Sequence, residues 1–426
     1  MKIRFKNAKI LKNAFADITE GEVHIDGGAI VYVGKEKPFE ADAVKDCGGN
    51  LLIPSFANAH AHSAMTLFRG AADDLPLKTW LYDRIFPLED HLTEEDVYWG
   101  NLLAAAEYVR GGVTAVADMY FYDDVILETL RDKAGLALAL CSGANDIGGG
   151  TEQELENIEA AYNKYRGERL KYFIGLHAEY TCSDALLEGV ADLSAKYGAP
   201  TYIHCAETLG EVGECSVRRA LTPVEYLHKI GFFDNGGIIA HGTYLDKNDI
   251  ALLNDKNVCV ASNPSSNLKL ASGVASVYSM LKNGVKVALG TDGAASNNKL
   301  SMFREMYLMS CLQKERMKDA SAVNAETALC AAGKTGWEAL GFNGGEIAEG
   351  KVADLALIDL SAPSMRPLTD IKKSLVYAAD TSAVSMTVAG GRIVYENGEY
   401  YIGEKIDDIY KNAEKCVKRL LKEADG

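Results

Sequence analysis

The sequence is short of basic residues, and this shortage excludes several functions. Forty-four Lys and Arg residues stand against 60 Asp and Glu residues, so the formal net charge is −16 and the pI is about 5.1. A field of this sign repels nucleic-acid phosphates and anionic lipid surfaces. We therefore expect neither nucleic acid nor a membrane among the partners of this protein.

Long apolar runs and paired cysteines are also missing. No window approaches the roughly 18 uncharged apolar residues of a membrane span. Residues 1–18 contain no apolar stretch that leads to a small-residue cleavage site. The nine cysteines form no CxxC pair, which is typical of reduced, mostly buried thiols. These absences predict a cytoplasmic protein.

The middle of the chain repeats one pattern. Nearly continuous apolar runs alternate with segments of helical periodicity, as expected for parallel strands that are buried on both faces. The expected strands are 51–60, 114–120, 135–141, 172–178, 200–206, 237–242, 257–262 and 285–292. Eight such units predict an α/β protein with a (β/α)8, or TIM, barrel. A doubly wound sheet is the alternative, but no GxGxxG follows any of the strands.

The two ends of the chain differ from its middle. Short alternating runs with Gly27-Gly28, Gly390-Gly391 and Asn397-Gly398 as turns predict hairpins at both ends. We expect these pieces to form one small β-sandwich, since chain termini often lie close together. The predicted segments are a first sandwich part (1–52), the barrel (53–345), a second sandwich part (346–403) and a C-terminal helix (404–426).

Histidines gather at the predicted strand ends. His60 and His62 lie two residues apart on the first strand, so both imidazoles project from the same face. His177, His204 and His241 end the fourth, fifth and sixth strands, and Asp292 ends the eighth. In a barrel the carboxyl ends of all strands meet at the face that carries active sites.

Imidazoles and a carboxylate at one face suit a divalent transition metal. Zinc is the default, and Fe2+ or Mn2+ would accept the same ligands. A second metal would need a bridging acid or a modified lysine from a middle strand, and the fourth strand has no lysine at its carboxyl end, so we expect one metal per chain. Glu207 stands three residues after His204, where its carboxylate could carry protons without binding the metal.

Several motifs resemble those of the amidohydrolase superfamily. The segments are PSFANAHAHSAMTLFRG (54–70), HCAE (204–207), AHG (240–242), SNPSSNLKL (262–270) and LGTDGAASN (289–297). Within that superfamily the chain is most similar to the metal-dependent 5′-methylthioadenosine/S-adenosylhomocysteine deaminases. The resemblance covers nearly the whole chain, including the split sandwich.

The resemblance implies a role for each candidate site residue. His60, His62, His204 and Asp292 would hold the metal, and Glu207 would be the proton shuttle. His241 and Asp292 would orient the attacking water, which adds to C6 of adenine so that ammonia leaves and an inosine analogue remains. The family's ribose-binding, tryptophan and purine-contacting positions fall on Glu89, Trp80 and His177.

The substrate implied is a small purine nucleoside: 5′-methylthioadenosine, 5′-deoxyadenosine, adenosine or S-adenosylhomocysteine. In this subgroup arginines from the third strand and the following loop bind the homocysteine carboxylate, but residues 135–163 contain no Lys or Arg. We therefore expect S-adenosylhomocysteine to be a poor substrate, unless an arginine from another loop or subunit supplies the missing charge. Arg218 and Arg219 are candidates for this role.

Other functions stay open at this point. The same metal site would serve deamination or dechlorination of guanine, a pterin or an s-triazine, although Glu89 and His177 favour a nucleoside. A non-catalytic metal-binding barrel is a further alternative. The presence of both Glu207 and Asp292 argues against it. Active-site loops in this branch often receive residues from a neighbouring subunit, so a homo-oligomer is compatible with the resemblance.

Overall fold

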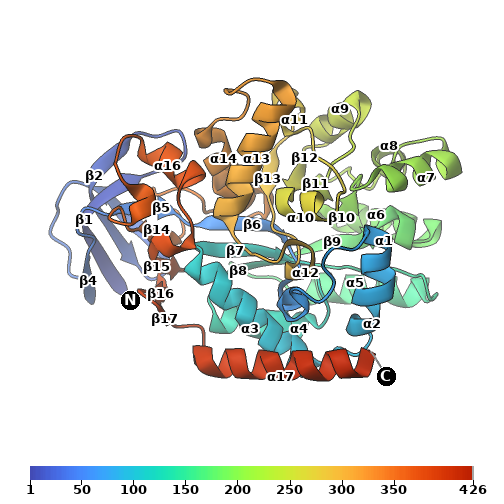
Figure 1. Ribbon diagram of the computed structural model, residues 1–426, viewed down its shortest axis with the longest axis horizontal. Coiled ribbons are helices and arrows are strands. Elements are labelled where there is room, and N and C mark those ends of the chain that lie inside the picture. Colours follow the sequence, from blue (N-terminus) through green and yellow to red (C-terminus); the bar gives the residue numbers. More distant parts are fainter. Residues whose placement is uncertain (425–426) are drawn as a thin grey trace.

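The computed structural model describes residues 1–424, apart from the side chains of Leu77 and Lys78. It contains an eight-stranded parallel barrel and a nine-stranded mixed sheet that is built from both ends of the chain (Figure 1). The predicted barrel with a small β-domain is therefore confirmed. The limits of the four predicted segments stay predictions.

The barrel strands follow one another in chain order around the sheet. They are β6 (Phe56–Ala61), β7 (Val113–Asp118), β8 (Ala137–Cys141), β9 (Leu170–Ala178), β10 (Thr201–Cys205), β11 (Gly237–His241), β12 (Val258–Ser262) and β13 (Val287–Leu289). The last strand reaches the first where the backbone N–H groups of Thr291 and Asp292 donate to the His60 carbonyl. Gly290 permits this approach, because a Cβ there would lie 2.7 Å from the Cβ of His60.

Helices connect the strands and cover the outside of the barrel (Figure 1). They are α1 (Leu77–Trp80), α2 (Phe86–Glu89), α3 (Glu94–Arg110), α4 (Asp123–Ile126), α5 (Thr151–Lys164), α6 (Asp184–Tyr197), α7 (Leu209–Arg219), α8 (Pro223–Lys229), α9 (Lys247–Asp255), α10 (Pro264–Lys269), α11 (Val277–Lys282), α12 (Ala294–Asn297), α13 (Met302–Met317), α14 (Ala325–Ala332), α15 (Lys334–Ala339), α16 (Ile371–Tyr377) and α17 (Ile406–Ala424). Thr93 and Asp96 form a capping box at α3, and the Ser183 hydroxyl caps α6. Among residues 1–424, no helix combines the length and apolar character needed to cross a bilayer.

The terminal β-domain is one continuous sheet in the order β17-β16-β15-β14-β5-β1-β2-β3, with β4 also paired to β1. The strands are β1 (Lys2–Leu11), β2 (Ile18–Asp26), β3 (Ala29–Gly34), β4 (Ala43–Asp46), β5 (Leu51–Pro54), β14 (Leu355–Ile358), β15 (Val384–Ala389), β16 (Arg392–Glu396) and β17 (Glu399–Tyr400). The two halves form a single sheet because β5 pairs with β1 on one side and with β14 on the other. The glycine pairs 27–28 and 390–391 and the Asn397-Gly398 pair form the predicted turns.

The predicted strand 51–60 is in fact two strands in two different sheets. Residues up to Pro54 belong to β5 of the terminal sheet, and β6 of the barrel begins at Phe56. Ser55 is the crossing point: its N–H donates to the Asp354 carbonyl, and its own carbonyl accepts from the Trp337 indole. The residues before and after Ser55 are both apolar, so the sequence predicts buried strand on each side of it. Periodicity alone therefore cannot reveal that the chain changes from one sheet to the other.

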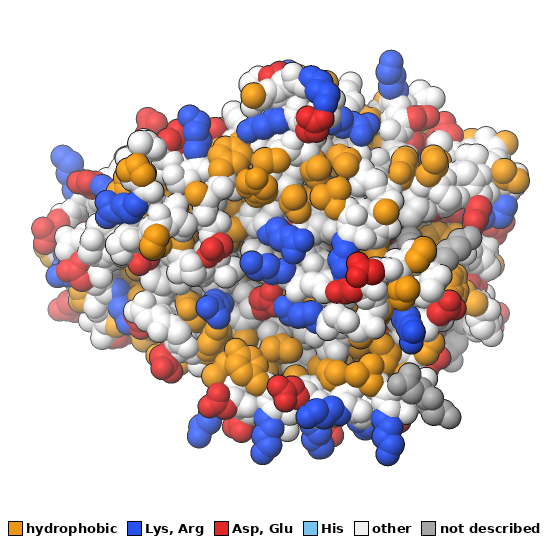
Figure 2. All heavy atoms as spheres, in the orientation of Figure 1, with side chains coloured by type: hydrophobic (Ala, Val, Ile, Leu, Met, Phe, Trp, Pro, Cys, Tyr) orange, Lys and Arg blue, Asp and Glu red, His pale blue; other side chains and the backbone are white. Residues whose placement is uncertain are grey.

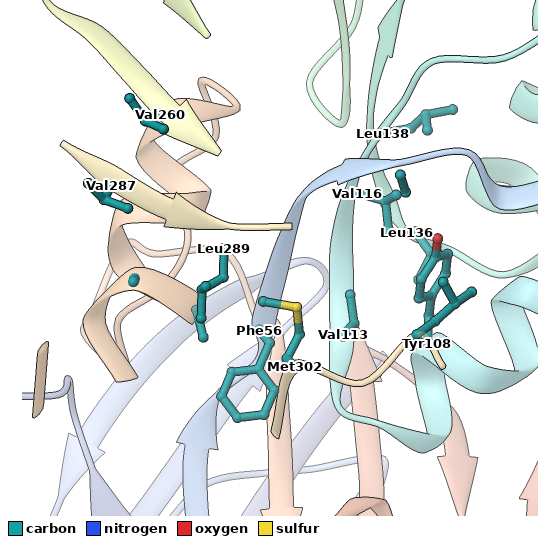
Figure 3. Close-up of a cluster of buried hydrophobic side chains, with 14 of the residues drawn as sticks. Phe56, Tyr108, Val113, Val116, Leu136, Leu138, Val260, Val287, Leu289 and Met302 are labelled. Atoms are coloured by element: carbon teal, nitrogen blue, oxygen red, sulfur yellow. The ribbon is translucent and has the colours of Figure 1, made fainter. Parts of the chain in front are cut away.

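The hydrophobic core has an outer and an inner layer. Branched and aromatic side chains fill the space between strands and helices, as Figure 3 shows for Phe56, Val116, Leu138, Val260 and Leu289. The inside of the barrel is lined largely by small residues; the alanines there include 57, 59, 115, 117, 137, 139, 240, 261 and 288. The bulky Phe173, Tyr202 and Trp337 complete this inner cluster.

Candidate active site and metal centre

Five of the predicted site residues meet at the carboxyl ends of the strands. His60 lies in β6, His62 directly follows that strand, His204 lies in β10, His241 ends β11, and Asp292 follows β13. All five are buried. His241 and Asp292 have left-handed backbone conformations, with φ of 73° and 61°. Such strain in residues other than glycine persists only where the surrounding structure enforces it, and it often marks functional sites.

Four of these side chains present atoms at the spacing of one metal centre. Asp292 Oδ1 lies 3.2 Å from His62 Nε2 and 3.4 Å from His60 Nε2, and the Nε2 atoms of His62 and His204 are 3.3 Å apart. Ligands on a tetrahedral zinc ion, with bonds of about 2.1 Å, lie roughly 3.4 Å from one another. His60 Nε2 is buried and has no hydrogen-bond partner among the described residues. This donor set therefore fits a divalent metal.

A hydrogen bond on the far side of the His60 ring determines which of its two nitrogens faces the metal centre. Tyr202 donates its hydroxyl hydrogen to the Ala59 carbonyl at 2.7 Å, and His60 Nδ1 lies 2.9 Å from the same hydroxyl oxygen. Since a tyrosine hydroxyl has one hydrogen, it accepts from the Nδ1–H of His60. The lone pair of His60 is thereby on Nε2, which is the atom a metal would bind.

Backbone carbonyls orient the other two imidazoles in the same way. His62 Nδ1 donates to the Met119 carbonyl at 2.5 Å, and His204 Nδ1 donates to the His177 carbonyl at 2.7 Å. A carbonyl only accepts, so Nδ1 carries the hydrogen in both rings. All three Nε2 atoms therefore point at one place with their tautomers set by the fold.

The electrostatics of the imidazoles differ although all are buried. Burial lowers the pKa of His60 to about 4, so its ring is neutral at pH 7. Burial also opposes the charged form of His62, but the hydrogen bond to Asp292 and the charge of that carboxylate raise the pKa of His62 to about 9. A doubly charged cation between His62 and Asp292 would displace this proton and take over its role.

The second oxygen of Asp292 is held by two serines. Ser266 Oγ and Ser296 Oγ donate to Oδ2 at 2.6 and 2.9 Å. Oδ1 is thereby left facing the imidazoles. Burial alone would raise the pKa of Asp292, but the hydrogen bonds and charges of His60 and His62 hold it well below its usual range.

A buried glutamate ties the two serine-bearing loops together. Glu305 of α13 accepts from the Ser265 N–H and from the Asn297 side-chain amide, both at 2.9 Å. Burial raises the pKa of Glu305 to about 7. One carboxylate thus fixes the loop after β12 and the loop after β13 at their shared edge of the site.

Glu207 and His241 stand side by side next to the metal centre. Glu207 Oε2 lies 3.8 Å from His241 Nε2, and Glu207 Oε1 accepts from the Ser272 hydroxyl at 3.1 Å. His241 Nδ1 lies 2.8 Å from Asn267 Oδ1, so this nitrogen carries the hydrogen and Nε2 faces Glu207.

Hydrogen bonds from the backbone to Glu211 fix the turn that carries Glu207. Glu211, at the first turn of α7, accepts the backbone N–H groups of Ala206 and Glu207, each at 2.7 Å. Ala206 has a left-handed φ of 54°. Burial and the charge of Glu207 raise the pKa of Glu211 to about 7. These bonds hold an unfavourable backbone conformation that aims the Glu207 side chain into the site.

A pocket of about 450 Å³ extends from this centre. Its wall includes His62, His204, His241, Asp292 and Glu207 at one end, and Trp80, Glu89 and His177 further along. The predicted substrate-contacting residues therefore share a cavity with the predicted ligands.

The Glu89 carboxylate is prepared to accept further hydrogen bonds. It accepts from the Tyr120 hydroxyl at 2.8 Å through Oε1, and within residues 1–424 no other group is bonded to it. Burial raises the pKa of Glu89 to about 7. Trp80 lines the same pocket and is only 6% exposed, and the indole nitrogen of Trp80 has no partner among the described residues.

Arg218 and Arg219 do not reach this pocket. Both donate to the buried carboxylate of Glu179 at 2.6 Å, and Arg219 also pairs with Asp184 and lies over the Tyr226 ring. In this structure both arginines are thus paired with Glu179, and neither belongs to the wall of the pocket. The suggestion that one of them rescues carboxylate binding stays a prediction that the structure does not favour.

Sequence reasoning missed the residues that orient the ligands. Ser266, Asn267 and Ser296 lie inside two quoted motifs, SNPSSNLKL and LGTDGAASN, but received no role. Tyr202 had a usable signal: it lies two residues before His204 on one strand, so both side chains face the barrel interior. Nothing in the local sequence pointed to Glu305, because its buried partners Ser265 and Asn297 lie 40 and 8 residues earlier in the chain and meet it only in the folded structure.

Comparisons with known proteins agree with this geometry. The family model described as the amidohydrolase family matches residues 51–394. A 5-methylthioadenosine/S-adenosylhomocysteine deaminase of Thermococcus kodakarensis is 41% identical over 399 residues, which cover 92% of this chain and 94% of that protein. A 5′-deoxyadenosine deaminase of Methanocaldococcus jannaschii is 39% identical and covers 96% of this chain and 99% of its own length.

A solved structure extends the agreement to three dimensions. The crystal structure of an adenosine deaminase from Xanthomonas campestris with bound zinc has a TM-score of 0.93 and 32% sequence identity. It covers 99% of this chain and 98% of that one. By sequence and by fold, this chain belongs to the amidohydrolase family.

Proposed function

We propose that this protein is a metal-dependent deaminase of adenine nucleosides that carry a small 5′ substituent. The products would be the corresponding inosine analogue and ammonia. The observation that carries the proposal is that one pocket holds both the convergent ligand set with Glu207 and, further along, the Glu89 carboxylate with a free oxygen. The names of the deaminases from Thermococcus and Methanocaldococcus support the same chemistry.

The metal ligands would be His60, His62, His204 and Asp292, which hold one divalent ion. Zinc is the favoured ion because it suits three imidazoles and a carboxylate, and the Xanthomonas structure was solved with zinc. When bound, the ion would supply Lewis acidity that makes a water molecule nucleophilic at neutral pH.

Glu207 would move protons during the reaction. Its Oε1 is held by Ser272, which leaves Oε2 facing the site and His241. From there the carboxylate can take a proton from the attacking water and deliver it to the purine ring nitrogen next to C6. The proton that the new C6 hydroxyl loses as the carbonyl forms would then pass to Glu207 and from it to the departing amine, so that the two water protons end on the ring nitrogen and on ammonia. Glutamates that are not metal ligands carry out this step in zinc deaminases of another fold.

His241 would orient the attacking water. Its Nδ1–H is committed to Asn267, so the Nε2 lone pair can accept a hydrogen bond from that water. Asp292 would accept a second one. With two acceptors fixed by the fold, the water would be oriented before it attacks C6.

The rest of the pocket would hold the nucleoside. Glu89 can accept hydrogen bonds from both ribose hydroxyls, and the Trp80 ring provides an apolar wall beside it. His177 Nδ1 lies 3.0 Å from the Thr181 hydroxyl, which donates to the Ala178 carbonyl, so the Nε2 lone pair of His177 faces away from this pair. His177 would contact the purine through that atom.

S-adenosylhomocysteine should be the poorest of the related nucleosides. Within the described part of the chain, no Lys or Arg lines the pocket. A carboxylate brought into it would lose its hydration without gaining a cationic partner. Adenosine, 5′-deoxyadenosine and 5′-methylthioadenosine carry no such group, so we expect all three to be deaminated faster.

Ammonia release by the zinc-loaded protein tests the proposed function. We expect turnover of adenosine, 5′-deoxyadenosine and 5′-methylthioadenosine and little turnover of free adenine, which lacks the ribose that Glu89 would hold. Equal rates on adenine and adenosine would instead favour another heterocycle as the substrate.

The variant Glu207→Gln tests the role of the shuttle. It should reduce kcat by about 100-fold or more, while metal analysis still finds one ion per chain. The control is Glu188→Gln on the exposed side of α6, which should keep full activity. Near-normal turnover by Glu207→Gln would show that another group moves the proton.

A further inference from the structure

The part of the pocket that lies away from the metal centre is lined by two acidic side chains and, among the described residues, by no basic one. It is bounded by the loop after β7, the loop after β8 and one face of α5. Glu154, Asn157, Ile158 and Ala161 of α5 line it, and their spacing of three, four and seven residues places them on one side of the helix. Asp123, the first residue of α4, faces the same space.

Among the described side chains, neither acid in this region has a partner. Asp123 and Glu154 are half-buried, and within residues 1–424 no hydrogen bond or ion pair reaches either carboxylate. Lys164, which lies near Asp123, donates instead to Asp124 at 2.7 Å. Burial and the neighbouring Asp124 and Asp118 raise the pKa of Asp123 to about 7, as expected for a carboxyl without a cation.

These acids lie where the 5′ substituent of a nucleoside would project. In the proposed function the base meets the metal ligands and the ribose meets Glu89. Tyr120 links these two regions, since its hydroxyl bonds Glu89 and its ring centroid is 6.2 Å from that of His62. Asp123 follows Tyr120 by three residues along the same loop. The 5′ group therefore enters the space between this loop and α5.

We propose that Asp123 and Glu154 select the charge of the 5′ substituent, so that nucleosides with a cationic, amine-bearing 5′ tail bind more tightly than neutral ones and carboxylate tails are rejected. An ammonium group in this space would gain two carboxylates that have no other partner, in a setting partly shielded from water. A carboxylate would be repelled by both. This inference rests on the proposed function, because it takes the base and ribose to occupy the other end of the pocket.

Binding of three matched thioethers tests the inference. The compounds are 5′-deoxyadenosines with a 5′-(3-aminopropylthio), a 5′-propylthio or a 5′-(2-carboxyethylthio) group, which differ mainly in terminal charge. Titration calorimetry on the zinc-loaded Glu207→Gln variant measures Kd without turnover. We expect the amine to bind about tenfold more tightly than the propyl compound and the carboxylate about tenfold more weakly.

Two variants connect the effect to the named acids. In a background that carries Glu207→Gln, the double substitution Asp123→Asn and Glu154→Gln should bring the three Kd values together while the propyl compound keeps its affinity. The matched control Glu156→Gln changes an exposed acid of the same helix and should preserve the order. Raising the salt concentration should shrink the differences, because half-buried charges are partly screened.

The outcomes separate this inference from the proposed function. Equal Kd values for the three compounds, or an unchanged order in the double variant, would overturn the charge selection while leaving a nucleoside deaminase intact. Failure of all three compounds to bind would overturn both statements. Tighter binding of the carboxylate would refute the inference and also the expectation for S-adenosylhomocysteine.

Discussion

At the scale of single residues, the metal centre depends on what lies behind each ligand. Three imidazoles donate from Nδ1 to acceptors that are fixed by the barrel, and two serines hold the outer oxygen of Asp292. Partners of this kind set the tautomer and direction of a ligand, and their loss typically weakens metal binding by about 10–100-fold. The geometry is thus prepared before any ion arrives.

Tyr202→Phe should weaken zinc binding by about 10–100-fold without unfolding the protein. The substitution keeps the buried ring but removes the hydroxyl that accepts from His60 Nδ1 and donates to the Ala59 carbonyl. Competition with a chelator of known affinity measures the change. Tyr226→Phe is the control, since Tyr226 is also buried but bonds Asp184 away from the centre. Equal zinc affinity of Tyr202→Phe and the parent would show that Tyr202 does not position His60.

At the scale of elements, the C-terminal helix α17 supports the wall of the pocket. It packs against α3, α2 and the segment after β6, and Figure 1 shows it lying along α3. Its buried residues Ala413, Cys416 and Leu420 share a cluster with Trp80 and Leu88 of the segment that carries Glu89. Charged side chains of both signs cover its outer edge (Figure 2). The helix thereby packs behind the α1–α2 segment, which lines the pocket.

Leu420→Ala should lower the free energy of unfolding by about 2–5 kcal/mol, because it opens a cavity where the side chain is only 1% exposed. The neighbouring Leu421→Ala changes a side chain that is 42% exposed and should alter stability by no more than about 0.5 kcal/mol. Urea unfolding of both variants gives the comparison. Similar midpoints for the two would mean that α17 contributes little to the fold.

At the scale of the whole molecule, the site spans the closure of the barrel. Its ligands come from the first, fifth and last parts of the barrel, and the backbone at Asp292 bonds the His60 carbonyl where β13 meets β6. The terminal sheet is locked to the barrel by Arg169, which donates twice to the buried carboxylate of Asp354. An ion bound between these strands would therefore stabilise the closed barrel.

Removal of the metal should lower the melting temperature of the protein. A ligand that binds only the folded state stabilises it by about 2.7 kcal/mol at a concentration 100 times its Kd. Calorimetry with and without added zinc measures this shift. Asp292→Asn should show a much smaller zinc-dependent shift than the parent. A melting temperature that is independent of zinc in the parent would contradict metal binding at this site.

The sequence by itself determined the family, the barrel and the set of candidate site residues. The family and the barrel are confirmed, and the structure brings His60, His62, His204, His241, Glu207 and Asp292 together as the motifs required. Strand periodicity and the position of each residue at a strand end were sufficient, because in a parallel barrel all carboxyl ends meet at one face. The roles assigned to these residues stay proposals.

Only the tertiary structure decided what surrounds these residues. The run 51–60 crosses from one sheet to another at Ser55, and the two arginines at 218 and 219 turn to Glu179 instead of the pocket. The presence of Asp123 and Glu154 in the wall of one pocket likewise depends on how the α4 and α5 segments pack. Such contacts join residues that are far apart in the chain, and local patterns carry no information about which distant side chain will satisfy a given charge or hydrogen bond.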